Sequence, residues 1–403
     1  MNPDIEKLQP YPFEKLKKLK SQALQKNAQP VVEGHIALSI GEPKHESPQF
    51  VLDAISGNLD LLNRYPLTRG SLELRSAIAD WLLRRFKLPD DSIDPDKHIL
   101  PVTGTREALF SFAQCFIDRS KDPLILMPNP FYQIYEGAAF LSGAEPYFYN
   151  TVKENDYLPD FDAIEESTWQ RCQIIYICTP GNPTGSVISK QQLIKLIELS
   201  QQYDFIIASD ECYSEIYFDE SNPPCGLLQA AEDCGNTGFQ NCIVFHSLSK
   251  RSNLPGMRSG FIAGDAELIK AYLLYRTYHG CAMPPVHQVA SIAAWKDESH
   301  VEQNRSLYRK KFEHVIDILK PVIEVTLPDA GFYIWLNTPV DDETFASGLY
   351  AQQNVTVLPG SYLSRESHGI NPGKNHVRMA LVAPLDECIT AANRIKQYIQ
   401  SLN

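Results

Sequence analysis

A lysine within a run of small hydroxyl residues is the most informative feature of this 403-residue chain. Lys250 follows Ser247 and Ser249, shortly after the apolar run Cys242–Phe245, and Arg258 comes eight positions later between two glycines. A lysine amine forms a Schiff base with an aldehyde, while hydroxyls and a guanidinium hold a phosphate. Pyridoxal 5′-phosphate (PLP) needs both, because its aldehyde and its phosphate project from neighbouring ring positions. The alternative is a surface turn with an ordinary lysine and arginine.

Other polar residues follow predicted strands, at the sheet edge where open α/β folds bind ligands. Asp210 ends the apolar run Phe205–Ser209, and a buried carboxylate needs a partner such as a protonated ring nitrogen. Its neighbour Glu211 should point to the opposite face of the sheet. The turn Gly104-Thr105-Arg106 opens a predicted helix, whose free N–H groups could hold a phosphate. A simple N-cap and turn would have the same sequence.

Three further side chains could face the same site. Asn182, in the Pro- and Gly-rich loop Thr179–Gly185, could donate a hydrogen bond inward. Tyr132, in the loop after Leu124–Met127, could stack on a planar cofactor. Arg378, in a predicted strand near the C-terminus, could bind a carboxylate bidentately. The simpler alternatives are a rigid loop, a core aromatic residue and a structural salt bridge.

Two patterns of elements follow each other along the chain. Strand-like runs alternate with helical patterns such as Lys190–Tyr203, which predicts a mostly parallel sheet covered by helices on both faces. These strands are expected at Ile99–Thr103, Leu124–Met127, Ile174–Cys178, Phe205–Ser209, Ile243–His246 and Phe261–Ala263. A long charged helix pattern, Lys296–Lys320, then precedes a smaller α+β pattern. Its elements are expected at Ile323–Thr326, Phe332–Leu336, Val355–Leu358 and Val377–Leu381, with a closing helix at Leu385–Leu402.

We therefore predict a large α/β domain over residues 46–295 and a small α+β domain built from residues 1–45 and 296–403. The net charge of −12 and the lack of a basic stripe argue against nucleic-acid binding. Nine cysteines without a Cys-x-x-Cys pair favour reduced thiols in a cytoplasmic protein. No metal site is expected, since no histidine pair has the spacing of a zinc motif. No membrane segment is expected, since no apolar run is long enough to span a bilayer.

Taken together, these motifs resemble the class I aminotransferases of PLP fold type I. The matching elements, in the family's order and approximate spacing, are Asn182, Asp210-x-x-Tyr213, Ser247-x-x-Lys250, Arg258 and Arg378. The resemblance runs from about Leu38 to the C-terminus. It implies a large domain with a mostly parallel sheet between helices, a smaller α+β domain, and amino-acid and keto-acid substrates.

The resemblance also implies a role for each matched residue. Lys250 would bind PLP covalently and move protons, Asp210 would pair with the ring nitrogen, and Tyr213 with Asn182 would contact the phenolate oxygen. Tyr132 would stack on the ring. The phosphate would be held by Gly104, Thr105, Arg106, Ser247, Ser249 and Arg258. The substrate α-carboxylate would be bound by Arg378, Asn182 and the backbone of Gly41. Tyr65 matches a tyrosine that reaches the neighbouring subunit's phosphate, which implies a homodimer.

Within the family, four stretches resemble the N-succinyldiaminopimelate aminotransferases of bacterial lysine synthesis. They are Leu8–Phe13, Ser39–His45, Pro128–Gly137 and Tyr275–Cys281. The implied substrates, N-succinyl-LL-2,6-diaminopimelate and 2-oxoglutarate, each carry a distal carboxylate. Candidate cations for it are Arg106, Lys44, Arg69 and Arg276. The alternatives are an aminotransferase for aspartate, alanine, aromatic amino acids or N-acetylornithine, a carbon–sulfur β-lyase, and a PLP-binding regulator without enzymatic activity.

Overall fold

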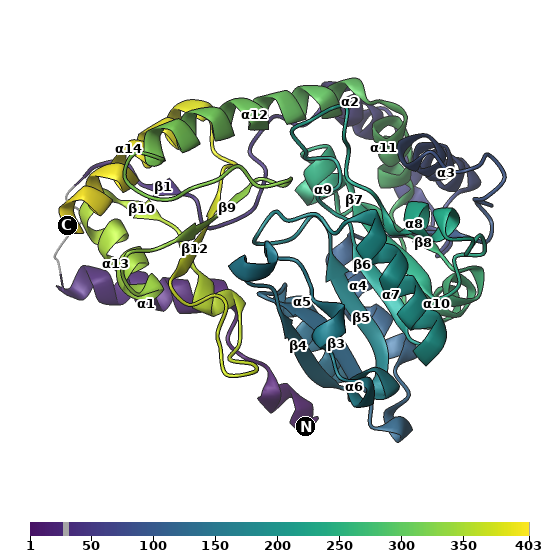
Figure 1. The fold of residues 1–403 in the computed structure, drawn as a ribbon. Helices are drawn as coiled ribbons and strands as arrows, with labels where there is room; N and C mark the ends of the chain where they lie inside the picture. Colours follow the sequence, from purple (N-terminus) through teal and green to yellow (C-terminus); the bar gives the residue numbers. More distant parts are fainter. Residues whose placement is uncertain (27–31, 403) are drawn as a thin grey trace.

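The computed structural model describes residues 1–26 and 32–402 (Figure 1). A seven-stranded sheet lies at the centre of the larger part of the molecule. The strand order is β2-β8-β7-β6-β5-β3-β4. The strands are β2 (Ile99–Val102), β3 (Leu124–Asn129), β4 (Glu145–Asn150), β5 (Cys172–Cys178), β6 (Ile206–Asp210), β7 (Cys242–Ser247) and β8 (Gly260–Gly264). Strands β3 to β7 are parallel, whereas β8 is antiparallel to both of its neighbours. The predicted mostly parallel sheet is confirmed.

Helices cover both faces of this sheet, because strand alternation sends apolar side chains to both sides. In β5, Ile174 and Tyr176 belong to one core, and Ile175 and Ile177 to the other. The first core includes α4 (Thr105–Phe116), α5 (Gln133–Ser142) and α10 (Ala266–His279). The second includes α2 (Gln49–Ser56), α3 (Leu72–Phe86), α6 (Glu166–Arg171), α7 (Lys190–Tyr203), α8 (Leu227–Asp233), α9 (Leu248–Arg251) and α11 (Pro285–Lys296).

Two small sheets occupy the other side of the molecule (Figure 1). One contains β9 (Tyr333–Asn337), β11 (Leu358–Pro359) and β12 (His376–Ala380), and the other pairs β1 (Ile36–Ala37) with β10 (Val355–Thr356). The surrounding helices are α1 (Pro12–Lys26), α12 (Ser299–Leu319), α13 (Asp342–Gln353) and α14 (Leu385–Leu402). Ile36 and Leu38 share a core with Phe312 and Leu336, so both ends of the chain contribute to it. The boundaries of the two domains stay a prediction.

The sequence pattern was wrong in two places and incomplete in two. The expected strand Val355–Leu358 is instead two short strands, β10 and β11, which belong to different sheets and are separated by Val357. The expected strand Ile323–Thr326 does not form, and the chain passes from α12 to β9 without pairing. Strand β4 was missed because it is an edge strand whose residues are mostly half-buried, so it lacks a continuous buried pattern. Strand β1 was missed because two residues are too few to show periodicity. Among the described residues, no helix is long and apolar enough to cross a membrane.

Candidate active site

A cavity of about 480 Å³ lies at the carboxyl ends of the central parallel strands. Asp210 ends β6, Ser247 ends β7, and Asn182 follows β5. All of the predicted site residues except Gly104 and Tyr65 line this cavity: Gly41, Thr105, Arg106, Tyr132, Asn182, Asp210, Tyr213, Ser247, Ser249, Lys250, Arg258 and Arg378. The fold therefore brings together residues from segments more than 300 positions apart.

Lys250 extends into the cavity from the short helix α9. Its amine donates a hydrogen bond to the carbonyl of Gly41 and lies 5.3 Å from the centre of the Phe332 ring. Burial lowers the pKa of the Lys250 amine to about 8; the nearby Cys212 opposes this shift and Arg378 adds to it. A lysine with this pKa supplies a useful fraction of neutral amine near neutral pH, as a nucleophile or a base requires.

Asp210 is buried and its carboxylate accepts hydrogen bonds from neutral donors. The Tyr135 hydroxyl donates at 2.7 Å and the Cys212 backbone N–H at 3.3 Å. Burial raises the pKa of Asp210, because a carboxylate loses its hydration there. In contrast, the carboxylate of Glu211 accepts hydrogen bonds from Ser209 and Leu227, away from the cavity. A cationic ring nitrogen would therefore complete the surroundings of Asp210.

A cradle for an anion lies where β2 passes into α4. Gly104 has a φ of +89°, and a Cβ atom there would lie 2.2 Å from Nη2 of Arg258. The turn therefore accepts only glycine while the guanidinium stays in place. Beside it, the Ser247 hydroxyl contacts the hydroxyl of Ser249 at 3.0 Å, and both hydroxyls line the cavity together with Arg258. Hydroxyls, a guanidinium and a helix N-terminus are the donors that a PLP phosphate requires.

Arg378 reaches the cavity from β12. Its guanidinium donates to Oδ1 of Asn182 and to the carbonyl of Ser39, each at 2.9 Å. Its buried Nε has no partner among the described residues. The ring of Tyr333 lies 4.5 Å from the guanidinium, and the Tyr333 hydroxyl is 3.0 Å from that of Tyr213. This arrangement leaves an oriented cation with a free donor, as binding of a carboxylate requires.

Sequence reasoning missed several residues of the cavity. Tyr333 packs so closely on the backbone of Gly41 that a Cβ there would meet its hydroxyl at 2.0 Å. Tyr135, in the stretch Pro128–Gly137, was given no role, yet its hydroxyl donates to the Asp210 carboxylate. The remaining ones are Tyr11, Pro12, Phe13, Ile40, Glu42, Gln133, Cys212, Pro255, Leu358 and Leu363. The aromatic motif Tyr11-Pro12-Phe13 was a signal that could have found the N-terminal contribution.

Tyr65 does not line the cavity of its own chain. Its side chain is fully exposed, with a relative exposure of 100%. If Tyr65 serves such a cavity, it therefore does so in a second copy of the chain.

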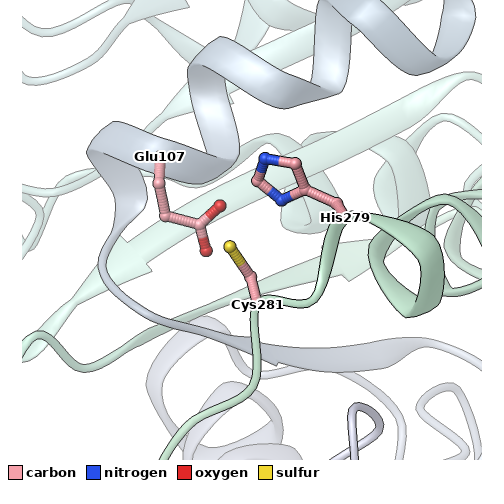
Figure 2. Close-up of side chains that lie close together, drawn as sticks. All are labelled: Glu107, His279 and Cys281. Atoms are coloured by element: carbon pink, nitrogen blue, oxygen red, sulfur yellow. The ribbon is translucent and has the colours of Figure 1, made fainter.

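The structure also brings together three residues whose side chains could ligate a metal. Figure 2 shows Glu107, His279 and Cys281 facing one another, with their ligand atoms within 4.8 Å. However, Nη1 of the fully buried Arg276 donates to both oxygens of Glu107, at 2.7 and 2.9 Å. A fixed guanidinium here neutralises the carboxylate and would repel a cation. We therefore assign the cluster to an ion pair that joins α4 to α10.

Comparisons with known proteins agree with this geometry. Residues 33–395 match the family model described as aminotransferase class I and II. An LL-diaminopimelate aminotransferase of Nitratidesulfovibrio vulgaris (strain DSM 19637 / Miyazaki F) is 31% identical over 397 residues, covering 96% of each chain. An aminotransferase structure from Neisseria meningitidis Z2491 has a TM-score of 0.92 and 50% identity, covering 98% of this chain and 99% of that one.

A third relative bears on the subgroup. The structure of a probable N-succinyldiaminopimelate aminotransferase from Thermus thermophilus has a TM-score of 0.80 and 25% identity, covering 96% of this chain and all of that one. The curated relative and both structures are aminotransferases by name, and the family uses PLP. The chain therefore belongs to the class I and II aminotransferases and is a PLP-dependent aminotransferase acting on amino-acid and keto-acid substrates.

Proposed function

We propose that the enzyme transfers the amino group of N-succinyl-LL-2,6-diaminopimelate to 2-oxoglutarate, giving N-succinyl-2-amino-6-oxopimelate and glutamate. The observation that carries this proposal is that a further guanidinium lines the cavity besides Arg378 and the Arg258 of the phosphate cradle. Arg378 enters from β12 and Arg106 from α4. One could bind the α-carboxylate and the other the distal carboxylate that both substrates carry.

Of the four candidate cations for the distal carboxylate, Arg106 alone lines the cavity. Its Nε donates to the Tyr132 hydroxyl at 2.6 Å and its Nη2 to the Tyr11 hydroxyl at 3.4 Å. Neither hydroxyl neutralises its charge. Arg69 instead pairs with Asp96 and Arg276 with Glu107. Lys44 is exposed and does not line the cavity.

The chain's own residues would share the work as follows. PLP supplies an electron sink when bound. Lys250 would hold it covalently, then remove the α-proton of the donor as a neutral amine. Asp210 would keep a proton on the ring nitrogen, and Tyr213 would donate to the phenolate oxygen. Arg378 would fix the α-carboxylate, while the guanidinium of Arg106 would bind the distal one.

The relatives give a second candidate donor, unsubstituted LL-diaminopimelate. Curated relatives near 31% identity carry that name, whereas the relative named for the succinylated compound is a structure at 25%. The distal end of this donor is zwitterionic, so it needs an anion beside the cation. Glu42 lines the same cavity and could supply that anion.

Single-turnover half-reactions on the holoenzyme, followed by visible absorbance, test the proposal. The donors are N-succinyl-LL-diaminopimelate, LL-diaminopimelate, N-acetylornithine, aspartate, alanine, glutamate and cystathionine. We expect fast conversion with the succinylated donor and glutamate and slow conversion with the others. Faster conversion of LL-diaminopimelate would establish the second candidate. Pyruvate released from cystathionine without lasting bleaching would overturn the aminotransfer preference in favour of β-elimination.

The distal contact has its own variant. We expect Arg106→Ala to slow the reaction of glutamate and the succinylated donor far more than that of alanine, which has no distal carboxylate. Arg69→Ala is the matched control, since Arg69 is an arginine whose partner Asp96 lies outside the cavity. Equal effects of Arg106→Ala on glutamate and alanine would remove Arg106 from this role.

A homodimer with shared sites is part of the proposal. Large apolar side chains are exposed near Tyr65, with relative exposures of 64% for Leu62 and 71% for Leu67. Two large leucines exposed close together indicate a surface that a second chain covers. Covering it would bring Tyr65 within reach of a neighbouring cavity.

A further inference from the structure

Lys311 is a buried ammonium group that the proposed reaction does not use. It lies on α12 with a relative exposure of 2%. Its Nζ contacts Nε2 of His45 at 2.6 Å and the carbonyl of Val382 at 3.4 Å, and lies 5.0 Å from the centre of the Tyr308 ring. No carboxylate within the described residues pairs with it. A buried cation without an anion is costly, so its retention calls for a reason.

The hydrogen bonds of Lys311 continue to the catalytic lysine. His45 Nδ1 contacts Oδ1 of Asn304 at 2.6 Å, and Nδ2 of Asn304 donates to the backbone carbonyl of Lys250 at 3.3 Å. Asn253 also donates to Oδ1 of Asn304, at 3.2 Å. Two side chains, those of His45 and Asn304, thus connect the ammonium on α12 to the backbone of α9.

The groups at the two ends of these hydrogen bonds determine their direction. An ammonium group only donates, so Nε2 of His45 must accept and Nδ1 must carry the proton. The oxygen of Asn304 then accepts and its amide nitrogen is left to donate to Lys250. The backbone carbonyl of Lys250 only accepts, so both ends require the same direction, and without the ammonium the Nε2 atom of His45 would lose its donor.

His45 belongs to a segment that contacts both reactive cations. This segment, Ser39–Ser47, is called the strap here. Its Ser39 carbonyl accepts from Arg378 and its Gly41 carbonyl accepts from the amine of Lys250. At its far end, the Ser47 hydroxyl donates to the Asn253 carbonyl at 3.0 Å. A shift of the strap would therefore displace acceptors from both the lysine and the carboxylate-binding arginine.

We propose that Lys311 is a positioning residue: its ammonium donates to His45 and so holds the strap, through His45 and Asn304, against Lys250 and Arg378. This rests on the role proposed above for those two residues. Lys311 touches neither substrate nor cofactor, and acts through the strap alone.

Several charged and titratable groups around Lys311 influence the protonation of its amine. They are His45 and Lys44 on the strap, Cys388 on α14 and Tyr308 on α12. Burial lowers the pKa of Lys311 to about 8, Cys388 opposes this and Lys44 adds to it. Burial and then Lys311 lower the pKa of His45 to about 4. At neutral pH Lys311 is therefore a donor and His45 a neutral acceptor.

Hydrogen exchange in the holoenzyme tests the proposal at the amides that border the strap, those of Leu38, which donates to Thr356, and of Ala380, which donates to the Leu38 carbonyl. We expect Lys311→Met to reduce their protection at pH 7 by about tenfold or more, because opening of the strap no longer breaks the hydrogen bond from Lys311 to His45. Lys310→Met is the matched control, since Lys310 is the exposed neighbour on the same helix. Unchanged protection of these amides in Lys311→Met, or a loss spread evenly over the chain, would overturn the proposal.

Two further measurements separate this inference from other failures. If Lys311→Met does not fold, His45→Gln removes the imidazole and keeps the buried lysine; full protection of the same amides in that variant would also overturn the proposal. In steady state, we expect Lys311→Met to raise the KM of the donor more than it lowers kcat, because Arg378 loses a fixed acceptor. The exchange result is independent of the preferred substrate, so it stands or falls apart from the diaminopimelate proposal.

Discussion

At the scale of single residues, the amine of Lys250 gives a pH-dependent prediction. Burial holds its pKa near 8, against an ordinary value of 10.5. Only the neutral amine attacks an aldehyde, so capture of PLP by the cofactor-free protein should rise with pH to a midpoint near 8. Stopped-flow absorbance measures this rate, with a lysine peptide and free PLP as the reference for the cofactor's own ionisation. A midpoint above about 10 would show that burial does not shift this group.

Asp210 is the second test at this scale. It is buried with neutral donors only, so a cationic ring nitrogen would be its sole strong partner. Asp210→Asn keeps the shape but cannot hold a proton on that nitrogen, and we expect a loss of at least about 10²-fold in the single-turnover rate. PLP should still bind, as seen in the visible spectrum. A variant that binds PLP and reacts at a near wild-type rate would exclude this role.

At the scale of elements, the turn from β2 into α4 depends on one glycine. Gly104→Ala introduces a Cβ at φ +89° and 2.2 Å from Nη2 of Arg258. We expect PLP to bind at least about tenfold more weakly, because the guanidinium must move from the phosphate cradle. Gly235→Ala is the control: its φ is +84°, yet nothing lies within 4 Å of its Cβ. Backbone strain costs about 1 kcal/mol in each variant. The difference between their PLP affinities, measured by equilibrium titration, therefore reports the displacement of Arg258. Equal affinities would contradict the cradle.

The same scale explains what the sequence could predict. Asp210 and Ser247 end buried strands, and parallel strands bring their carboxyl ends to one edge, so periodicity places them together. Nothing comparable relates the Ser39 carbonyl or Tyr333 to that edge, since Ser39 follows the short strand β1 and Tyr333 lies in β9, both outside the large sheet. Arg276 was a candidate for the cavity, but its partner Glu107 lies on a helix 169 positions away. The local sequence pattern predicts which face of a helix or strand is buried. It does not predict which charged residue from a distant segment contacts that face.

At the scale of the whole molecule, the proposal that Tyr65 completes the site of a neighbouring chain can be tested directly. Lys250→Ala and Tyr65→Ala should each lose most activity alone, the first from the absent amine and the second from a weakened phosphate site. Random mixing of the two variants would pair half of the chains as hybrids, each with one intact site. We therefore expect recovery of about a quarter of the wild-type activity after refolding the mixture. Sedimentation measures the dimer and steady-state assays the recovery.

This mixture distinguishes a dimer whose sites are shared between chains from a dimer in which each chain completes its own site. If each chain completed its own cavity, the hybrids would contain one site without Lys250 and one without Tyr65, and activity would stay at the sum of the two variants. Leu62→Arg gives the complementary test, because it places a charge on a leucine that is 64% exposed in the single chain. In a monomer this change costs little, whereas in the proposed dimer it buries an unpaired guanidinium. Dissociation of the dimer with a parallel loss of activity would therefore support the role of Tyr65 in the neighbouring cavity. An active monomer would exclude that role.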